Sequence, residues 1–149
     1  MSLVVSTTIT VKSPAFDHNG NIPVKYSCNG ENINPEIIIK DIPSGVKSLA
    51  LVVTDPDAPG GFVHWVMWNI PVTEKIAENS APGIQGKNGR DENKYHGPCP
   101  PNGTHHYHFY VYALDKKLDL PESSTKSALL NAIEGHILGS GEIIGLFKK

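Results

Sequence analysis

The stretch SLALVVTDPDAPGGFVHWVMWNI, from Ser48 to Ile70, determines the fold. Its first half is a nearly continuous apolar run, which is typical of a central strand. Its second half, from Phe62 onward, is rich in β-branched and aromatic residues and predicts a second strand. Prolines and a Gly-Gly pair between the two halves predict a turn. Two acids and a histidine, Asp55, Asp57 and His64, therefore lie on one hairpin.

Further strands are predicted on both sides of this hairpin, over residues 7–13, 36–42, 104–115 and 141–149. One helix is predicted over residues 125–138, where Leu and Ile recur at helical spacing and Ser123 or Ser124 is available as a cap. Residues 71–101 show little periodicity. A structureless stretch of that length in a compact domain is usually functional or wrongly assigned.

The composition is that of a globular protein. The 149 residues suffice for one domain, which at this size buries roughly 68–70% of its unfolded surface. Hydrophobic residues make up 39% of the chain and charged residues 19%. The 12 prolines and 14 glycines are spread along it and indicate many turns between short strands. We predict one mainly β domain over residues 1–149, a β-sandwich with a peripheral C-terminal helix.

Several classes of protein are excluded by charge and hydropathy. A net charge of −2 without Lys/Arg clusters argues against nucleic-acid binding. No apolar run approaches the ~20 residues of a membrane span. Residues 1–13 lack the basic start, the long apolar stretch and the cleavage site of a signal peptide. A cytoplasmic location is the resulting expectation.

The two cysteines, Cys28 and Cys99, are too few for a disulfide scaffold and form no C-x-x-C pair. In the cytoplasm we expect them to be reduced and to pack as small hydrophobic side chains. A single bridge between them is the alternative. Cys99 also has histidines near it in sequence, but the flanking prolines account for its loop without a nucleophilic role.

The hairpin acids and His64 allow two interpretations. If the backbone stays extended, Asp55 and Asp57 face the same way; if it turns, the Asp-Pro sequence favours an Asx-turn. His64 falls on the same strand face as Val66 and Trp68. A lone histidine in that setting is more often a core residue with its hydrogen bonds satisfied than a ligand-binding one.

The strand at 104–115 carries two sets of side chains. On an extended strand His105 and Tyr107 share one face, and His106 and His108 share the other. The second pair could chelate a metal, but no Cys or carboxylate accompanies it at ligand spacing, and we expect neither a metal nor a cofactor. The preceding loop GPCPPNG is rigid, and its glycines allow backbone N–H groups to approach an anion.

Together these stretches resemble the phosphatidylethanolamine-binding protein family, also called Raf kinase inhibitor proteins, in its prokaryotic branch. DPDAPGGFVHWVMWNIP resembles the first signature of that family and YHGPCPPNGTHHYHFYVYALD the second. IPVKYSCNGENINP and GHILGSGEIIGLF resemble its N-terminal and C-terminal motifs. The resemblance spans nearly the whole chain and implies a sandwich with Greek-key-type connections.

The resemblance also implies a small pocket that accepts anions such as phosphate, phosphoryl head groups and acetate-like ions. Carried over, its ligand-binding residues are Asp55, Asp57, His64, Gly97, Pro98, Pro101, His105 and Tyr107. We expect both histidines to present protons to an anionic oxygen, with an adjacent carboxylate favouring the imidazolium form. We expect Asp55 to orient the histidines, Asp57 to be structural, and a backbone N–H near Gly97 to complete the site.

This sequence departs from the family pattern at three places. His106 stands where the family usually has Arg. Its side chain should point away from the pocket, and an ion pair on that far face should be lost. Near the end of the chain, residues 145–147 read GLF where prokaryotic relatives usually have Gly-x-Tyr. It also lacks the extra C-terminal helix of eukaryotic members, which predicts a more open pocket.

Three functions remain open at this point. The first is a non-enzymatic protein that binds an anionic or phosphorylated ligand and modulates a kinase or protease, as the resemblance implies. The second is a small hydrolase that uses His64, His105 and Asp55, although no activated nucleophile is visible. The third is a pure interaction module with a vestigial pocket. The resemblance further implies a homodimer.

Overall fold

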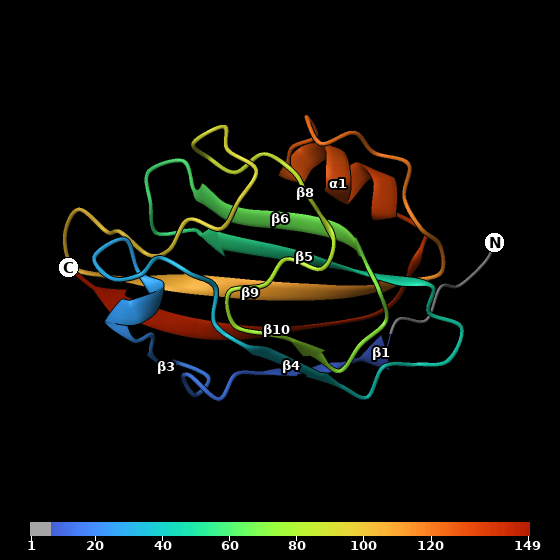
Figure 1. The fold of residues 1–149 in the computed structure, drawn as a ribbon, viewed down its shortest axis with the longest axis horizontal. Coiled ribbons are helices and arrows are strands. Elements are labelled where there is room, and N and C mark those ends of the chain that lie inside the picture. Colours follow the sequence, from blue (N-terminus) through green and yellow to red (C-terminus); the bar gives the residue numbers. More distant parts are fainter. Residues whose placement is uncertain (1–6) are drawn as a thin grey trace.

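Two sheets pack face to face in the computed structural model, which describes residues 7–149 (Figure 1). Residues 1–6 belong to the segment for which no signal peptide is predicted, and they lie outside the described residues. The large sheet has the strand order β1-β10-β9-β5-β6-β8, with β3 also paired to β10. Its strands are β1 (Thr7–Thr8), β3 (Gly20–Asn21), β5 (Ser48–Asp55), β6 (Phe62–Ile70), β8 (Ile84–Gln85), β9 (Thr104–Leu114) and β10 (Ile137–Lys148). The small sheet has the order β2 (Thr10–Lys12), β4 (Ile37–Lys40) and β7 (Lys75–Ile76).

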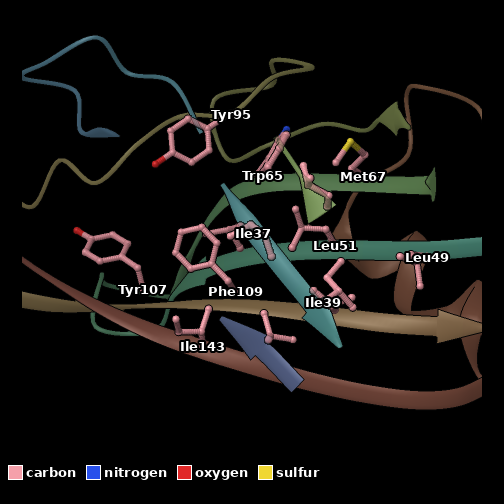
Figure 2. Close-up of a cluster of buried hydrophobic side chains, with 14 of the residues drawn as sticks. Ile37, Ile39, Leu49, Leu51, Trp65, Met67, Tyr95, Tyr107, Phe109 and Ile143 are labelled. Carbon is pink, nitrogen blue, oxygen red and sulfur yellow. The ribbon is translucent and has the colours of Figure 1, made fainter. Parts of the chain in front are cut away.

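The main core fills the space between the two sheets. Ile37 and Ile39 of β4 face Leu51 of β5 and Phe109 of β9, and all four are fully buried (Figure 2). A second cluster covers the outer face of the large sheet, where α1 (Lys126–Ile133) packs Leu129 against it. The predicted mainly β sandwich with one peripheral helix is therefore confirmed. No helix within residues 7–149 has the length and hydropathy needed to span a bilayer.

The central strands match the sequence pattern and the outer elements differ from it. The predicted strands at 48–55, 62–70 and 104–115 correspond to β5, β6 and β9. The segment 7–13 is not one strand, because Ile9 separates β1 in the large sheet from β2 in the small one. The long stretch 71–101 contains the short strands β7 and β8, so part of it was wrongly assigned as loop.

The helix is shorter than predicted. Thr125, and neither Ser123 nor Ser124, caps its first turn by accepting a hydrogen bond from the Ala128 amide. Gly135 has a positive φ of 81° and ends the helical path, as glycine commonly does after a helix. The residues from Ile137 onward then belong to β10, which pairs with β9 along its whole length.

The expectation of two reduced cysteines is wrong, because Cys28 and Cys99 form a disulfide with Cα atoms 5.5 Å apart. The sequence spacing of 71 residues hides this proximity. Cys28 follows a short 3-10 turn (Val24–Tyr26), and this loop lies against the loop that leads into β9. The bond also excludes Cys99 as a free nucleophile.

Replacing both cysteines with serine should lower the free energy of unfolding by about 4 kcal/mol, because the bond closes a loop of 71 residues in the unfolded chain. Urea denaturation of the Cys28→Ser/Cys99→Ser variant and the oxidised wild type measures the difference. Wild type in reductant is the control and should match the variant. Equal unfolding midpoints in all three samples would contradict a structural role for the bond.

Candidate binding pocket

A cavity of about 290 Å³ lies at the end of the sandwich where β5 ends and β6 and β9 begin. In Figure 1 this is the end where the loops after β5, after β8 and before β9 gather. Five of the predicted site residues line the cavity and three do not. Its lining comprises Asp55, Ala58, Phe62, His64, Arg90, His96, Cys99, Pro100, Pro101, His105 and Tyr107.

Asp55 joins two parts of this pocket through its two carboxylate oxygens. Oδ1 accepts a hydrogen bond from the Asp57 amide at 2.9 Å, which is the predicted Asx-turn. Oδ2 lies 2.6 Å from Nδ1 of His105. Both side chains are buried, with 4% and 9% of their surface exposed. The turn and the ligand-orienting interpretations of Asp55 are therefore compatible, because each uses a different oxygen.

His64 does not lie on the face that the alternation predicts. In the pairing of β5 with β6, Val53 is opposite Trp65 and Thr54 is opposite Val63, so a β-bulge leaves His64 without a partner. Val63 consequently packs on the outer face of the sheet. The His64 ring instead lies edge-on to Tyr107, 5.2 Å between centroids, on the inner side. The predicted shared face with Val66 and Trp68 is therefore wrong.

The structure also contradicts the expectation that His64 presents an imidazolium. Its ring is 4% exposed, and this burial lowers the pKa of His64 to about 4, although the carbonyl of His96 and the charge of Asp55 act in the opposite direction. Nδ1 lies 2.6 Å from the carbonyl oxygen of His96, which can only accept a hydrogen bond. At neutral pH the ring is therefore neutral, with its proton on Nδ1.

The hydroxyl of Tyr107 is a buried polar group without a hydrogen-bond partner among the described residues. Figure 2 shows it pointing away from Phe109 and the apolar core. Burial, followed by the nearby charge of Asp55, raises the pKa of Tyr107. The group therefore stays protonated and can donate at any physiological pH. An unpartnered buried hydroxyl is costly, which makes it a marker for a missing ligand or water.

The loop before β9 forms the pocket wall and is tied to the loop after the 3-10 turn. The disulfide makes one tie, and the Cys28 amide donates to the Pro98 carbonyl at 3.1 Å. The Gly97 amide donates to Asn32 Oδ1 at 2.7 Å, so this amide is not free to bind an anion, and the prediction of a backbone N–H near Gly97 in the site stays a prediction. A Cβ at Gly97 would lie 2.1 Å from the Tyr26 carbonyl oxygen. Gly97 and Pro98 therefore build the wall, while Pro101 lines the cavity.

Asp57 and His106 form a pair outside the cavity. Asp57 Oδ2 accepts from the His106 amide and contacts its Nδ1, both at 2.7 Å. These bonds lower the pKa of the Asp57 carboxyl. His106 points to solvent as predicted, and its ring keeps a contact with an acid on that side. His108 contacts a different acid, Glu142, and no cluster of three metal-ligating side chains exists among residues 7–149.

Three lining residues that could take part in ligand recognition were missed by the sequence reasoning. His96 stacks parallel to His64 at 5.7 Å, and Phe62 lies edge-on to His64 at 4.8 Å. Both residues lie within the two stretches that resemble the family signatures, so the sequence did contain a signal for them. Arg90 is the sole arginine of the chain and reaches the pocket from the loop after β8. It lies in the stretch without periodicity, where nothing singles it out.

Comparison with known proteins places these features in a family context. The profile described as "Phosphatidylethanolamine-binding protein" matches residues 12–148. A UPF0098 protein of Methanothermobacter thermautotrophicus is 42% identical over 95% of this chain and 99% of its own length. A UPF0098 protein of Archaeoglobus fulgidus is 44% identical over 97% of this chain, which spans only 53% of that relative.

Solved structures give the same result. A crystal structure of a phosphatidylethanolamine-binding protein homologue from Chlamydia trachomatis superposes with a TM-score of 0.92 at 40% identity, over 97% of this chain and 99% of that one. Escherichia coli YbcL is described as a new member of the mammalian phosphatidylethanolamine-binding protein family. It superposes with a TM-score of 0.88 at 26% identity, over 96% of this chain and 99% of that one.

The buried neutral His64 should make the protein less stable in acid. The unfolded chain binds a proton at this residue below pH ~6.5, whereas the folded protein does so only near pH 4. Wild type should therefore lose on the order of 3 kcal/mol relative to His64→Gln as the pH falls from 6.5 to 4. Urea unfolding across this range measures the loss. His136→Gln, which changes an exposed histidine, is the control. Parallel curves of unfolding free energy against pH for wild type and His64→Gln would refute the assignment.

Proposed function

Because this chain belongs to the phosphatidylethanolamine-binding protein family, we propose that its pocket binds a small anion, such as a phosphoryl group. The observation that carries the proposal is the Tyr107 hydroxyl, which is buried without a partner among the described residues and lines the cavity. It is a fixed, protonated donor, and an anionic oxygen is the natural acceptor for it. The cavity of about 290 Å³ suits a head group rather than a whole lipid.

The charges around the cavity support an anionic ligand. Asp55 would repel an anion if it were alone, but its Oδ2 lies 2.6 Å from Nδ1 of His105 and its Oδ1 accepts from the Asp57 amide, so both oxygens already have partners. Arg90 adds a permanent positive charge to the lining, although its Nε also lies 3.4 Å from Glu92. The pocket thus offers donors from two sides.

An enzymatic role is the second candidate, and the Asp55–His105 pair is the observation that favours it. A carboxylate that orients a histidine is the arrangement of a general base. We nevertheless propose that the chain is not a hydrolase, since Cys99 is bonded to Cys28 and no serine or threonine of residues 7–149 lines the cavity. Hydrolysis of p-nitrophenyl acetate or phosphate at the same rate by wild type and Asp55→Asn would support this proposal.

We further propose, on the family resemblance, that the protein modulates a kinase or protease and that it forms a homodimer, which sedimentation analysis would test. A purely interacting protein with a vestigial pocket predicts no anion binding at all. A cytoplasmic location must accommodate the Cys28–Cys99 disulfide. Such bonds persist in oxidising compartments and in the cytoplasm of hyperthermophiles.

Removal of the Tyr107 hydroxyl should weaken anion binding without weakening the fold. We expect Tyr107→Phe to bind inorganic phosphate and phosphorylethanolamine at least about tenfold more weakly, which is the loss of one hydrogen bond to a charged group. Its free energy of unfolding should be unchanged or higher, because an unpartnered buried hydroxyl is removed. Calorimetric titration and urea denaturation measure the two quantities.

Tyr95→Phe is the matched control. Tyr95 is also buried, but its hydroxyl donates to the Tyr26 carbonyl at 2.7 Å and does not line the cavity. This variant should bind phosphate as wild type does and lose about 1 kcal/mol of stability. If wild type binds neither phosphate nor phosphorylethanolamine at tens of millimolar, the proposed function is wrong.

A further inference from the structure

The orientation of the His64 proton limits what the pocket can recognise. Nδ1 is 2.6 Å from the His96 carbonyl oxygen, which accepts only, so Nδ1 carries the hydrogen. A neutral imidazole has one N–H, and its other nitrogen, Nε2, then offers a lone pair. No hydrogen bond within the described part of the chain joins Nε2 to another group of the protein. His64 lines the cavity, so this lone pair is available to a ligand.

Burial outweighs the groups around His64 that favour a second proton on its ring, which are the backbone of His96 and Gly97 and the charge of Asp55. From β5, the carboxylate of Asp55 is already in contact with His105 of β9 at 2.6 Å. From β9, Tyr107 offers a neutral hydroxyl. From the wall loop, His96 stacks on His64, and Arg90 adds a positive charge to the same cavity. Burial and the charge of Arg90 keep the pKa of His96 low. His64 is therefore an acceptor beside two donors, the Tyr107 hydroxyl and the Arg90 guanidinium.

We propose that the pocket selects oxyanions that carry a proton, so that hydrogenphosphate and phosphomonoester monoanions bind well and sulfate is rejected. The inference rests on the proposed anion-binding function and adds the residue that sets its specificity. An oxygen bearing hydrogen donates to Nε2 of His64, while a bare oxygen accepts from the Tyr107 hydroxyl. Sulfate has no hydrogen at neutral pH, and its oxygen would meet the lone pair of Nε2.

The pocket should bind sulfate much more weakly than phosphate. A site built to hydrogen-bond a hydroxyl rejects an analogue without that hydrogen far more strongly than one differing in apolar bulk. We expect sulfate to bind at least about 100-fold more weakly than phosphate at pH 7. The two ions are similar in shape and size, so the cavity volume does not explain such a ratio.

The pH dependence separates the proton of the ligand from those of the protein. A phosphomonoester loses its last proton with a pKa of about 6, whereas inorganic phosphate keeps one throughout the range from pH 6 to 8. Affinity for phosphorylethanolamine should therefore fall about 50-fold more than affinity for phosphate between these pH values. Any change in the charge of the protein between these pH values affects both ligands and cancels in the ratio.

The test is calorimetric titration of the wild-type protein with sodium phosphate, sodium sulfate and phosphorylethanolamine at pH 6 and 8. His64→Gln is the informative variant, because a glutamine amide rotates to present either N–H or C=O. It should retain phosphate binding and bring the phosphate-to-sulfate ratio to within a few fold. His136→Gln, whose ring contacts Asp115 outside the cavity, should keep the wild-type ratio.

The outcomes are distinct. Strong phosphate binding with weak sulfate binding in wild type, reduced to near equality in His64→Gln, supports the inference. Equal affinities of wild type for the two ions overturn it and leave the proposed anion-binding function intact. Binding of neither ion overturns both. If His64→Gln fails to fold, the wild-type ion ratio and its pH dependence still decide.

Discussion

The buried carboxylate of Asp55 is the group on which the pocket end of the molecule depends. It ends β5, holds the following turn through one oxygen and positions His105 of the neighbouring β9 through the other. A buried carboxylate is costly unless every such contact is made, because it has left water for a low-dielectric interior. One side chain therefore links the geometry of the turn after β5, the pairing of β5 with β9 and the orientation of His105.

The pocket combines a rigid apolar frame with a few polar groups. Its floor belongs to the large sheet, so His105 and Tyr107 take their positions from the strand that also carries Phe109 into the core. Its wall is loop, but a loop held by a disulfide and by backbone hydrogen bonds. Such a frame fixes the positions of the ring nitrogens before a ligand arrives, which lowers the entropic cost of binding.

The sequence predicted the central strands and the inner face of β9, because burial with a period of two residues leaves a direct pattern in a regular strand. It failed at His64, since Val-His-Trp-Val contains no glycine or proline to signal a bulge. It also failed at Cys28 and Cys99, whose contact depends on how two distant loops fold. The resemblance to a family supplied five residues that line the cavity, whereas Arg90 and the state of the His64 proton required coordinates.

The Cys28–Cys99 bond also determines what a cut in the backbone would do. It turns residues 28–99 into a covalent ring that contains β4, β5, β6, β7 and β8, while β9 and β10 lie outside it. The exposed turn at Pro59–Gly61 borders the pocket and belongs to this ring. A protease that cleaves there would leave both pieces joined, with β9 still paired to β5 and β10. A single nick near the ligand site would therefore not release a fragment until the disulfide was reduced.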